Sequence, residues 1–342
     1  MKTVNELSLL LDEPINTLTF FAKHSYLFYK EFEIPKKRGV RVIHTYMCNS
    51  EQKQVDVNEL NKLLDTMSKD KRVQGSWHLR QIHNKINDRI FKKLEYPESV
   101  HGFLPNRSTI TAVKPHVGKE WLISFDIKDF FESTTSKHIR NSLEYYYGFS
   151  NSVSWLLSKL VTRKNRLPQG AVTSPMASNV AFAPIDVTIG DFCNEYGITY
   201  TRYADDLIFS FNGDLKSVVL EEIPKLLNEY KINNKKTKVY SPNDIHYALG
   251  YVVNTKVNVN KTARRNLEAA IYNFVYKKLI PAEQLSNPVQ YKRSLLGKAN
   301  YMLKANPDLG RLRRRTEELR QFDPNKTEFK ELKGVKIWDV NI

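Results

Sequence analysis

The chain has 342 residues, 41% hydrophobic and 26% charged, and its 53 Lys and Arg against 37 Asp and Glu give a formal net charge of +16. No apolar run approaches the roughly 18 residues of a membrane helix, so the composition excludes a membrane-embedded chain and favours a globular one. The positive surplus attracts polyanions, above all nucleic acid, although a generic basic surface or weak attraction to anionic lipid would give the same balance.

Cysteine usage and the first residues bear on localisation. Cys48 and Cys193 lie far apart and have no CxxC spacing. A disulfide framework or zinc site is therefore not expected, and a reducing cytoplasm fits. The opening apolar run is interrupted by Asp12, Glu13 and Pro14, unlike that of a signal peptide. We expect a cytoplasmic protein that does not associate with a membrane.

The first hundred residues alternate between helical and extended patterns. Residues 1–30 have a helical pattern, and residues 31–47 alternate in the manner of a β-hairpin with a basic tip at 36–39. Residues 51–96 are polar and helical in pattern, and 97–106 are rich in turn formers. The irregular apolar stripe of the first segment consists of Leu7, Leu11, Leu18, Phe21 and Tyr26.

The middle of the chain contains two predicted buried strand regions. Residues 121–127 are a short apolar run typical of a buried strand, and 135–163 have a helical pattern. Two prolines and a glycine make 167–175 a loop, after which 176–196 return to helix. Residues 198–212 place β-formers on both sides of Ala-Asp-Asp, which predicts a strand, a tight turn and a second strand.

The last third becomes helical and more basic. Residues 214–230 have a helical pattern, 237–260 contain at least two strands, and the chain from 262 onward is helical. This alternation indicates an α/β or α+β class, with a boundary near residue 260 between a mixed region and a helical one.

Two carboxylate clusters could carry chemistry. Asp126 and Asp129 end the predicted buried strand, and Asp205 and Asp206 occupy the predicted hairpin tip. Adjacent carboxylates in an apolar setting repel each other, and a divalent cation is the usual neutralising partner. Phosphoryl transfer from a nucleotide uses two such ions. The alternative is plain turn chemistry, because Asp is favoured in turns.

An ordered series of motifs surrounds these carboxylates, and it resembles that of bacterial reverse transcriptases, in the branch shared by retrons, group II introns and phage-defence enzymes. The resemblance covers about residues 25 to 320. The segments that carry it are YKEFEIPKKRGVRVI (29–43), HGFLPNRSTITAVKPH (101–116), FDIKDFF (125–131), RLPQGAVTSPMASNVAF (166–182), TRYADDLIFSF (201–211), KINNKKTKV (231–239) and LGYVVN (249–254).

The resemblance implies an α+β right-hand polymerase with fingers, palm and thumb. Residues 1–120 would form the fingers with an N-terminal helical extension. Residues 121–260 would form the palm, a small antiparallel sheet backed by helices, with inserted fingers elements. Residues 261–342 would form a basic, helical thumb.

The resemblance also assigns the metal site. Asp126, Asp205 and Asp206 would be the catalytic aspartates that bind two Mg²⁺ ions, and Ile127 would offer a backbone carbonyl to the metal. Asp129 would be a helix N-cap or a group beside the metal ligands.

Several residues would then bind the incoming deoxynucleoside triphosphate. Phe131 would pack under the sugar and exclude a 2′-hydroxyl, unless it is a core aromatic; if the stretch is extended, Phe130 would point to the opposite face. Gln169 would face the nucleotide and template, and Gly170 would let the backbone approach closely. Lys236 would support the palm or the triphosphate.

The basic hairpin and the C-terminal region would contact phosphates. Arg41, with Lys36 and Lys37, would clamp the triphosphate, although the two lysines could equally be a solvated turn. Arg107, His116 and Tyr203 are the further nucleic-acid candidates, with Tyr203 near the primer terminus. The thumb surface, alternatively an ordinary amphipathic bundle with a solvated basic face, comprises Tyr272, Tyr276, Lys277, Lys278, Tyr291, Arg293, Arg311, Arg313, Arg314 and Arg315.

The compact chain and its FDIKDFF segment favour a retron enzyme, which copies a structured noncoding RNA and primes from a 2′-hydroxyl within it. Two family elements depart from the retron pattern: NAxxH reads AVKPH, with Ala112 at the Asn position and His116 kept, and VTG reads Ala248-Leu249-Gly250. The alternatives are another antiphage or abortive-infection reverse transcriptase, or a catalytically idle RNA-binding subunit. An effector protein is a possible partner.

Overall fold

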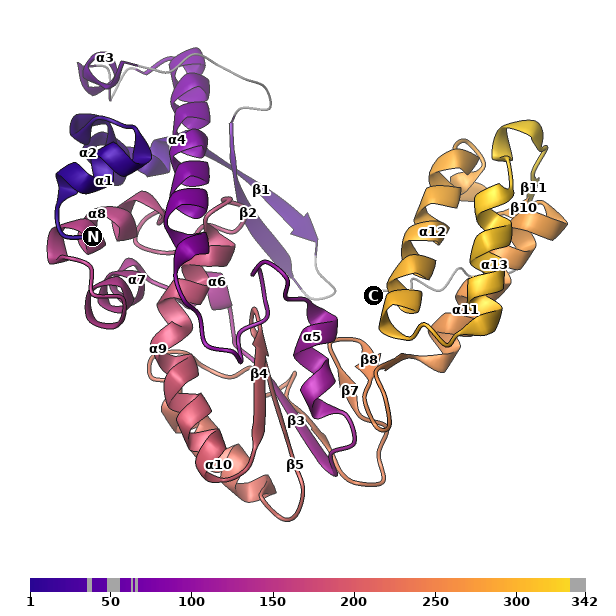
Figure 1. Ribbon diagram of the computed structural model, residues 1–342. Helices are drawn as coiled ribbons and strands as arrows, with labels where there is room; N and C mark the ends of the chain where they lie inside the picture. Colours follow the sequence, from indigo (N-terminus) through magenta and orange to yellow (C-terminus); the bar gives the residue numbers. More distant parts are fainter. Residues whose placement is uncertain (36–38, 48–55, 63, 65–66, 333–342) are drawn as a thin grey trace. The chain divides into compact units, whose positions relative to one another are not determined.

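The computed structural model describes residues 1–35, 39–47, 56–62, 64 and 67–332, and the chain divides into two compact units (Figure 1). The first unit comprises Met1–Ala112 and Trp121–Val239, and the second comprises Val113–Glu120 and Tyr240–Ile342. The second unit thus begins earlier than the compositional boundary expected near residue 260, because a small sheet precedes its helices.

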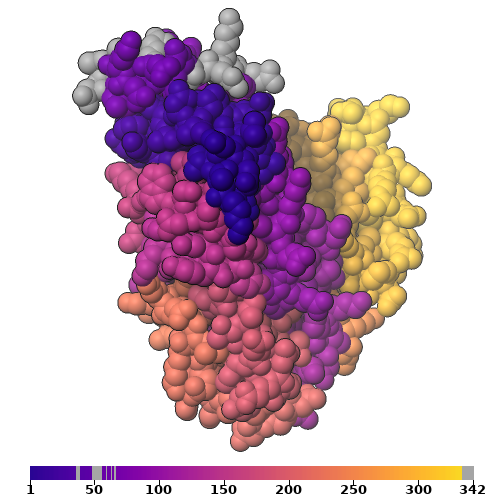
Figure 2. All heavy atoms as spheres, turned by 60° about the vertical axis from the view of Figure 1, so that its left-hand side comes forward, coloured from indigo at the N-terminus to yellow at the C-terminus, as the bar shows by residue number. Residues whose placement is uncertain are grey.

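The N-terminal helices of the first unit are α1 (Val4–Leu11) and α2 (Ile15–His24), and they pack on α8 (Asn151–Leu160) and α4 (Lys69–Arg89). In the space-filling view, the N-terminal helices lie directly on the magenta segment that contains α8 (Figure 2). The predicted apolar stripe is buried except for Tyr26, which is 42% exposed because it lies in a 3₁₀ turn, Ser25–Phe28, rather than in a continuing helix.

The predicted hairpin is confirmed. Strand β1 (Tyr29–Pro35) pairs antiparallel with β2 (Val40–Tyr46), and Ile34 lies opposite Arg41. Its expected basic tip, Lys36, Lys37 and Arg38, lies outside the described residues, as does Cys48. The short elements of this half are α3 (Val57–Lys62), a 3₁₀ turn at Phe91–Lys93, α5 (Thr109–Val113) and a 3₁₀ turn at Lys114–His116.

A four-stranded sheet with the order β4-β5-β3-β6 forms the centre of the first unit. Both β3·β5 and β4·β5 pairings are antiparallel. Helices α9 (Ser174–Glu195) and α10 (Lys216–Leu226) back the sheet and share its core. A small antiparallel sheet backed by helices was the expectation for this region. The strands are β3 (Trp121–Asp126), β4 (Thr199–Tyr203), β5 (Asp206–Phe211) and β6 (Lys238–Tyr240).

The helix predicted over 135–163 is broken in two. Helix α7 (Ser136–Asn141) runs into a π-helical turn, Ser142–Tyr146, and ends there. The side chain of Ser150 accepts a hydrogen bond from the backbone N–H of Val153 and so begins α8. A capping serine after a glycine is a helix-start signal, which the apolar periodicity alone does not reveal.

The second unit is mainly helical, but it also contains strands. An antiparallel three-stranded sheet, β7-β8-β9, leads into the helices. The expectation of a wholly helical region from 262 onward missed the parallel pair β10·β11, whose strands are far apart in the sequence. The elements are β7 (Tyr247–Ala248), β8 (Tyr251–Val252), β9 (Asn258–Val259), α11 (Lys261–Tyr272), a π-helical turn at Asn273–Lys277, β10 (Leu279–Ile280), a 3₁₀ turn at Ala282–Gln284, α12 (Pro288–Ala305), α13 (Gly310–Gln321), a 3₁₀ turn at Pro324–Lys326 and β11 (Lys330–Glu331).

Mixed helices and small antiparallel sheets confirm the α+β class. Among the residues that the structure describes, no helix combines the length and apolarity needed to cross a bilayer.

Candidate active site

Three aspartates lie at one end of the central sheet. Asp126 is the last residue of β3 and is the register partner of Asp206, the first residue of β5. Directly opposed residues in an antiparallel pair have Cα atoms about 4.5–5.5 Å apart, so the two side chains share a face. Asp205 belongs to the turn before β5, and its carbonyl accepts a 2.9 Å hydrogen bond from the backbone N–H of Ile127. Strand pairing therefore brings the two predicted carboxylate clusters together.

The cationic side chains near this cluster do not offset the burial and mutual repulsion of Asp205 and Asp206. Burial raises the pKa of Asp206 to about 6, and the neighbouring carboxylates Asp205 and Asp126 add to the shift. Burial likewise raises the pKa of Asp205. Carboxylates that repel one another in a partly desolvated site have the oxygen donors and the excess charge that suit a hard divalent cation.

Lys236 now provides the counter-charge for Asp126. Its Nζ donates a hydrogen bond to Oδ1 of Asp126, and the Asn233 side chain lies 3.5 Å from Oδ2. In the described part of the chain, no three His, Cys, Asp or Glu side chains already form a metal-holding group. The donor types fit a divalent cation, but a cation on Asp126 would have to compete with Lys236.

Asp206 should make the metal-free protein less stable as the pH rises. Its folded-state pKa of about 6 lies above the ordinary value of 3.8, so its contribution to stability is complete below pH 3.8 and is lost as the pH passes through 6. We expect the free energy of unfolding to fall across this window by about 2 kcal/mol more in wild type than in Asp206→Asn. Urea unfolding in EDTA at a series of pH values from 4 to 7 measures this free energy. If it fell equally with pH in wild type and in Asp206→Asn, the prediction would be contradicted.

A cavity of about 560 Å³ opens beside the aspartates. It is lined by the predicted nucleotide-binding residues Arg41, Phe131, Gln169 and Lys236 together with Asp126 and Asp205. Besides Asp126 of β3 and Asp205 of the turn before β5, these residues come from the β1·β2 hairpin, from α6 (Phe130–Ser133), from the loop before α9 and from the segment after α10. Asp206 is not among the lining residues, and Lys37 lies outside the described residues.

The hairpin is held against the loop before α9. The backbone N–H of His44 donates a 2.7 Å hydrogen bond to the carbonyl of Gln169. Gly170 has a φ of +115°, and a Cβ placed on it would lie 2.7 Å from the carbonyl oxygen of His44. The predicted close approach at Gly170 is thus an approach to the hairpin.

Asp129 and its two phenylalanine neighbours differ from the extended arrangement considered above. Asp129 adopts a left-handed conformation with φ of 49°, and α6 begins at Phe130. Asp129 holds the N-cap position, but its exposed side chain makes no capping hydrogen bond. Both phenylalanines border the cavity, but Phe130 is buried in the core of the sheet, whereas Phe131 is only partly buried.

Two of the predicted nucleic-acid contacts are residues that the structure engages or buries within the protein. Nη1 of Arg107 donates hydrogen bonds to the backbone carbonyls of Pro97, Glu98 and Val100, so it ties down the turn-rich segment instead of offering that nitrogen to a phosphate. His116 has no exposed surface and cannot touch RNA in this conformation. Tyr203 remains partly exposed, with its ring 6.3 Å from that of Phe103.

The aromatic and basic residues of the second unit separate into surface and core. Tyr272 and Tyr276 are exposed, and their rings stack 5.2 Å apart. The guanidinium of Arg315 lies over both rings, at 4.6 and 5.1 Å from their centroids. Tyr291 and Lys278 instead pack inward, on Phe274 and Phe322. The exposed cations of the predicted surface are Lys277, Arg293, Arg311, Arg313 and Arg314.

The sequence reasoning missed a buried ion pair behind the aspartates. Arg202 and Asp186 are both completely buried and are joined by two hydrogen bonds. The sequence signal for this pair was an arginine among the β-forming threonines and tyrosines of β4.

Comparison with known proteins gives consistent results. The sequence model described as "Reverse transcriptase (RNA-dependent DNA polymerase)" matches residues 34–253. The chain is 31% identical over 255 residues to the retron Mx65 reverse transcriptase of Myxococcus xanthus, with 67% of this chain and 57% of that protein covered. It is 29% identical over 239 residues to the retron Ec86 reverse transcriptase of Escherichia coli, with 68% and 71% covered.

Coverage of a third relative is also partial. The chain is 30% identical to the retron Se72 reverse transcriptase of Salmonella heidelberg, with 57% of this chain and 54% of that protein covered. The chain thus spans little more than half the length of two of these relatives. Among solved structures, apo telomerase from Candida tropicalis matches at 14% identity and a TM-score of 0.48, with 87% of this chain and 56% of that chain covered.

Proposed function

The chain belongs to the reverse transcriptase family, and from this premise we propose that it is a retron-type RNA-directed DNA polymerase that copies a structured noncoding RNA into DNA. The observation that carries the proposal is the union of Asp126, Asp205 and Asp206 at one sheet end, next to a cavity that also presents Arg41, Phe131 and Gln169. Carboxylates beside a cavity that also offers cationic side chains are what nucleotidyl transfer requires.

In this proposal the three aspartates hold two Mg²⁺ ions, with the backbone carbonyl of Ile127 as a further ligand. The two ions would stabilise the negative charge on the attacking 3′-oxygen and on the departing pyrophosphate. Arg41 binds the triphosphate, because a guanidinium offers two parallel donors to phosphate oxygens. Lys236 leaves Asp126 and follows the triphosphate, since both partners offer anionic oxygens to the same ammonium group.

We propose that residues 1–120 form the fingers, 121–260 the palm and 261–342 the thumb, and that each of them contributes contacts to the nucleic acid. Tyr203 borders the primer terminus. The exposed cations Arg293, Arg311, Arg313 and Arg314 bind the phosphate backbone, and the stacked Tyr272 and Tyr276 are suited to bases or sugars. This surface lies within the second unit and is formed by α11, α12, α13 and the π-helical turn that follows α11.

Phe131 is proposed to be the sugar gate. Its ring borders the cavity beside Asp126, where it would exclude a 2′-hydroxyl. We expect Phe131→Ala to raise the ratio of ribonucleotide to deoxynucleotide incorporation by about tenfold or more, on the scale of one lost steric contact. Single-nucleotide insertion kinetics with dCTP and CTP measure the ratio. Phe192→Ala is the control, because it removes a ring near the C-terminal end of α9. An unchanged ratio in Phe131→Ala would mean that the Phe131 ring serves only in the core.

Primer extension on an RNA template with Mg²⁺ and deoxynucleotides tests the polymerase proposal. Extension by wild type is expected, and no product on any template, including co-purified RNA, would leave only the idle RNA-binding alternative. Sequencing the nucleic acid that co-purifies with the protein tests the retron assignment. A branched RNA–DNA species is expected, with an effector protein and antiphage defence as its proposed setting.

One observation favours a different cognate RNA or another defence enzyme. The retron elements near His116 and Gly250 are altered, and Ala112 at the usual Asn position is buried, with its carbonyl accepting a hydrogen bond from Thr201. Linear complementary DNA without a branch, copied from an RNA that is not of the retron type, would support the alternative of another defence reverse transcriptase.

A further inference from the structure

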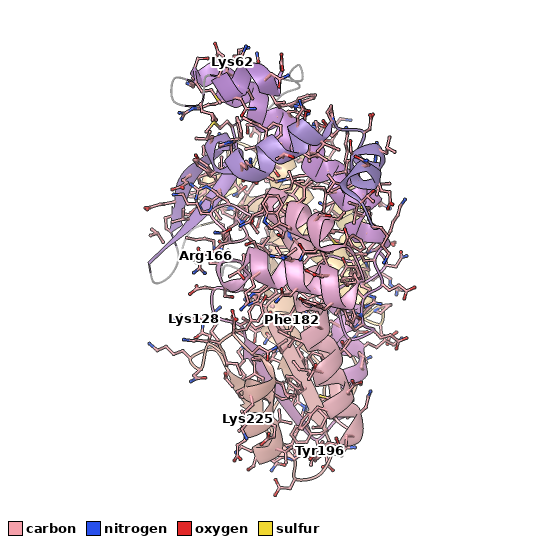
Figure 3. All side chains as sticks on the ribbon, turned by 90° about the vertical axis from the view of Figure 1, so that its left-hand side faces the viewer. Lys62, Lys128, Arg166, Phe182, Tyr196 and Lys225 are labelled. Carbon is pink, nitrogen blue, oxygen red and sulfur yellow. The ribbon has the colours of Figure 1, made fainter. Side chains whose placement is uncertain are left out.

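Arg202 in β4 is the largest of the fully buried side chains in the described residues. Its Nε and Nη2 donate hydrogen bonds of 2.8 and 2.7 Å to the two carboxylate oxygens of Asp186 on α9. Its guanidinium also lies 4.8 Å from the centre of the Phe182 ring on the same helix (Figure 3 labels Phe182). The side chain is therefore fixed by the helix that backs the sheet.

The remaining nitrogen of Arg202 holds the turn that carries the aspartates. Nη1 donates to the carbonyl of Ala204 at 3.2 Å and to Oδ1 of Asn179 at 3.1 Å. Ala204 has a φ of 56°, a left-handed conformation that costs an L-residue about 1–2 kcal/mol. A strained residue persists only where its surroundings hold it, and the guanidinium is one of the groups that do so.

A second set of contacts fixes the same turn from the segment that precedes α5. The backbone N–H of Arg202 donates to the carbonyl of Ser99 at 2.7 Å, and its own carbonyl accepts from His101 at 2.8 Å. The Asn179 side chain donates to the carbonyl of Gly102, whose α-carbon is so close to Ala204 that a Cβ there would lie 2.7 Å from its nitrogen. The turn is thus enclosed between α9 and this segment.

Stability alone does not account for such a pair. A buried ion pair pays a desolvation penalty that often equals its attraction, and well-packed apolar residues can replace it with no loss of stability. What apolar residues cannot do is donate a hydrogen bond to the carbonyl of Ala204, one residue before Asp205.

We propose that Arg202 is a positioning residue, which connects Asp186 on α9 to the carbonyl of Ala204 and so sets the place of Asp205 and Asp206 for metal binding. The inference rests on the proposed polymerase function. Displacing reactive groups by about 1 Å can cost roughly 100-fold in rate.

Three variants separate positioning from folding. Arg202→Lys keeps the charge opposite Asp186, but a single ammonium cannot reach both carboxylate oxygens and the Ala204 carbonyl together. The triple variant Tyr200→Phe/Asp186→Leu/Arg202→Met replaces the pair by apolar side chains and leaves no orphan hydroxyl, because the Tyr200 hydroxyl donates to Asp186. Tyr200→Phe alone is the matched control, since it leaves the Arg202–Ala204 contact in place.

The measurements are kcat, KM for the deoxynucleotide, the MgCl₂ concentration for half-maximal primer extension, and the urea midpoint. In Arg202→Lys and the triple variant, kcat should fall about 100-fold and half-maximal MgCl₂ should rise, while KM for the nucleotide stays near that of Tyr200→Phe. The triple variant should unfold at a lower urea concentration than the control, because the Ala204 carbonyl and Oδ1 of Asn179 lose the Arg202 donor, but it should remain folded in the absence of urea. If it does not fold, Arg202→Lys decides the question.

The outcomes distinguish this inference from the proposed function. An inactive wild type overturns the polymerase proposal itself. An active wild type, together with folded Arg202 variants of unchanged kcat and unchanged MgCl₂ requirement, overturns the positioning role. Activity that falls only in proportion to the unfolded fraction, with no change in the MgCl₂ requirement, also overturns it.

Discussion

Asp206→Asn is expected to reduce primer extension by roughly three orders of magnitude. Loss of a metal ligand removes several kcal/mol of transition-state stabilisation, at about 1.4 kcal/mol for each factor of ten. The loss should appear in kcat, because the lining of the cavity, including Arg41 and Gln169, remains intact. Single-turnover extension of an annealed primer with saturating deoxynucleotide measures the effect.

The control for this variant is Asp214→Asn, which removes the same charge from an exposed position shortly after β5. It should leave the rate unchanged. The metal-free Asp206→Asn protein should also be more stable than wild type near neutral pH, since it lacks a carboxyl whose pKa is raised by burial and like charges. Full activity in Asp206→Asn would mean that the assignment of the metal ligands is wrong.

Gly170→Ala is expected to raise KM for the deoxynucleotide by about 10- to 100-fold. A φ of +115° is strained for any residue with a Cβ, and that Cβ would meet the His44 backbone at 2.7 Å, so the hairpin would have to move away from the loop. Arg41 lies on the same strand as His44 and would move with it. Steady-state extension kinetics over a range of deoxynucleotide concentrations measure the shift.

Gly213→Ala separates backbone strain from steric displacement. Gly213 also has a positive φ, of 78°, but a Cβ there meets nothing within 4 Å. In Gly213→Ala the free energy of unfolding should fall by about 1 kcal/mol, and KM for the deoxynucleotide should not change. If Gly170→Ala and Gly213→Ala behave alike, the docking of the hairpin on the loop does not govern nucleotide binding.

Local signals predicted most of the elements. The β1·β2 hairpin, β3, α9 and the β4–turn–β5 unit all followed from alternation, apolar runs and turn formers, which are properties of neighbouring residues. The helix over 135–163 failed because apolar periodicity continues through the π-helical turn at Ser142–Tyr146. The parallel β10·β11 pair was not predicted, because strands of two residues have no periodicity in the sequence.

The candidate site likewise contains residues that the sequence could select and residues whose surroundings it could not predict. The motif series predicted Asp126, Asp205 and Asp206 as metal ligands and Arg41 and Gln169 as nucleotide contacts, and the structure places Arg41 and Gln169 in the lining of the cavity that Asp126 also borders. The roles expected of Arg107 and His116 rested on their places in the same motif series. The burial of His116 and the hydrogen bonds from the Arg107 side chain to the carbonyls of Pro97, Glu98 and Val100 follow from packing, which a motif does not report.

The sequence by itself determined which residues end a strand, occupy a turn or carry charge, because those features depend on a few consecutive side chains. Only the tertiary structure decided that Asp126 lies opposite Asp206, that Lys236 pairs with Asp126, and that Arg202 is joined to Asp186 and the Ala204 carbonyl. Strand register and the desolvation of buried charge depend on contacts between distant segments, which exist only once the sheet and α9 have packed together.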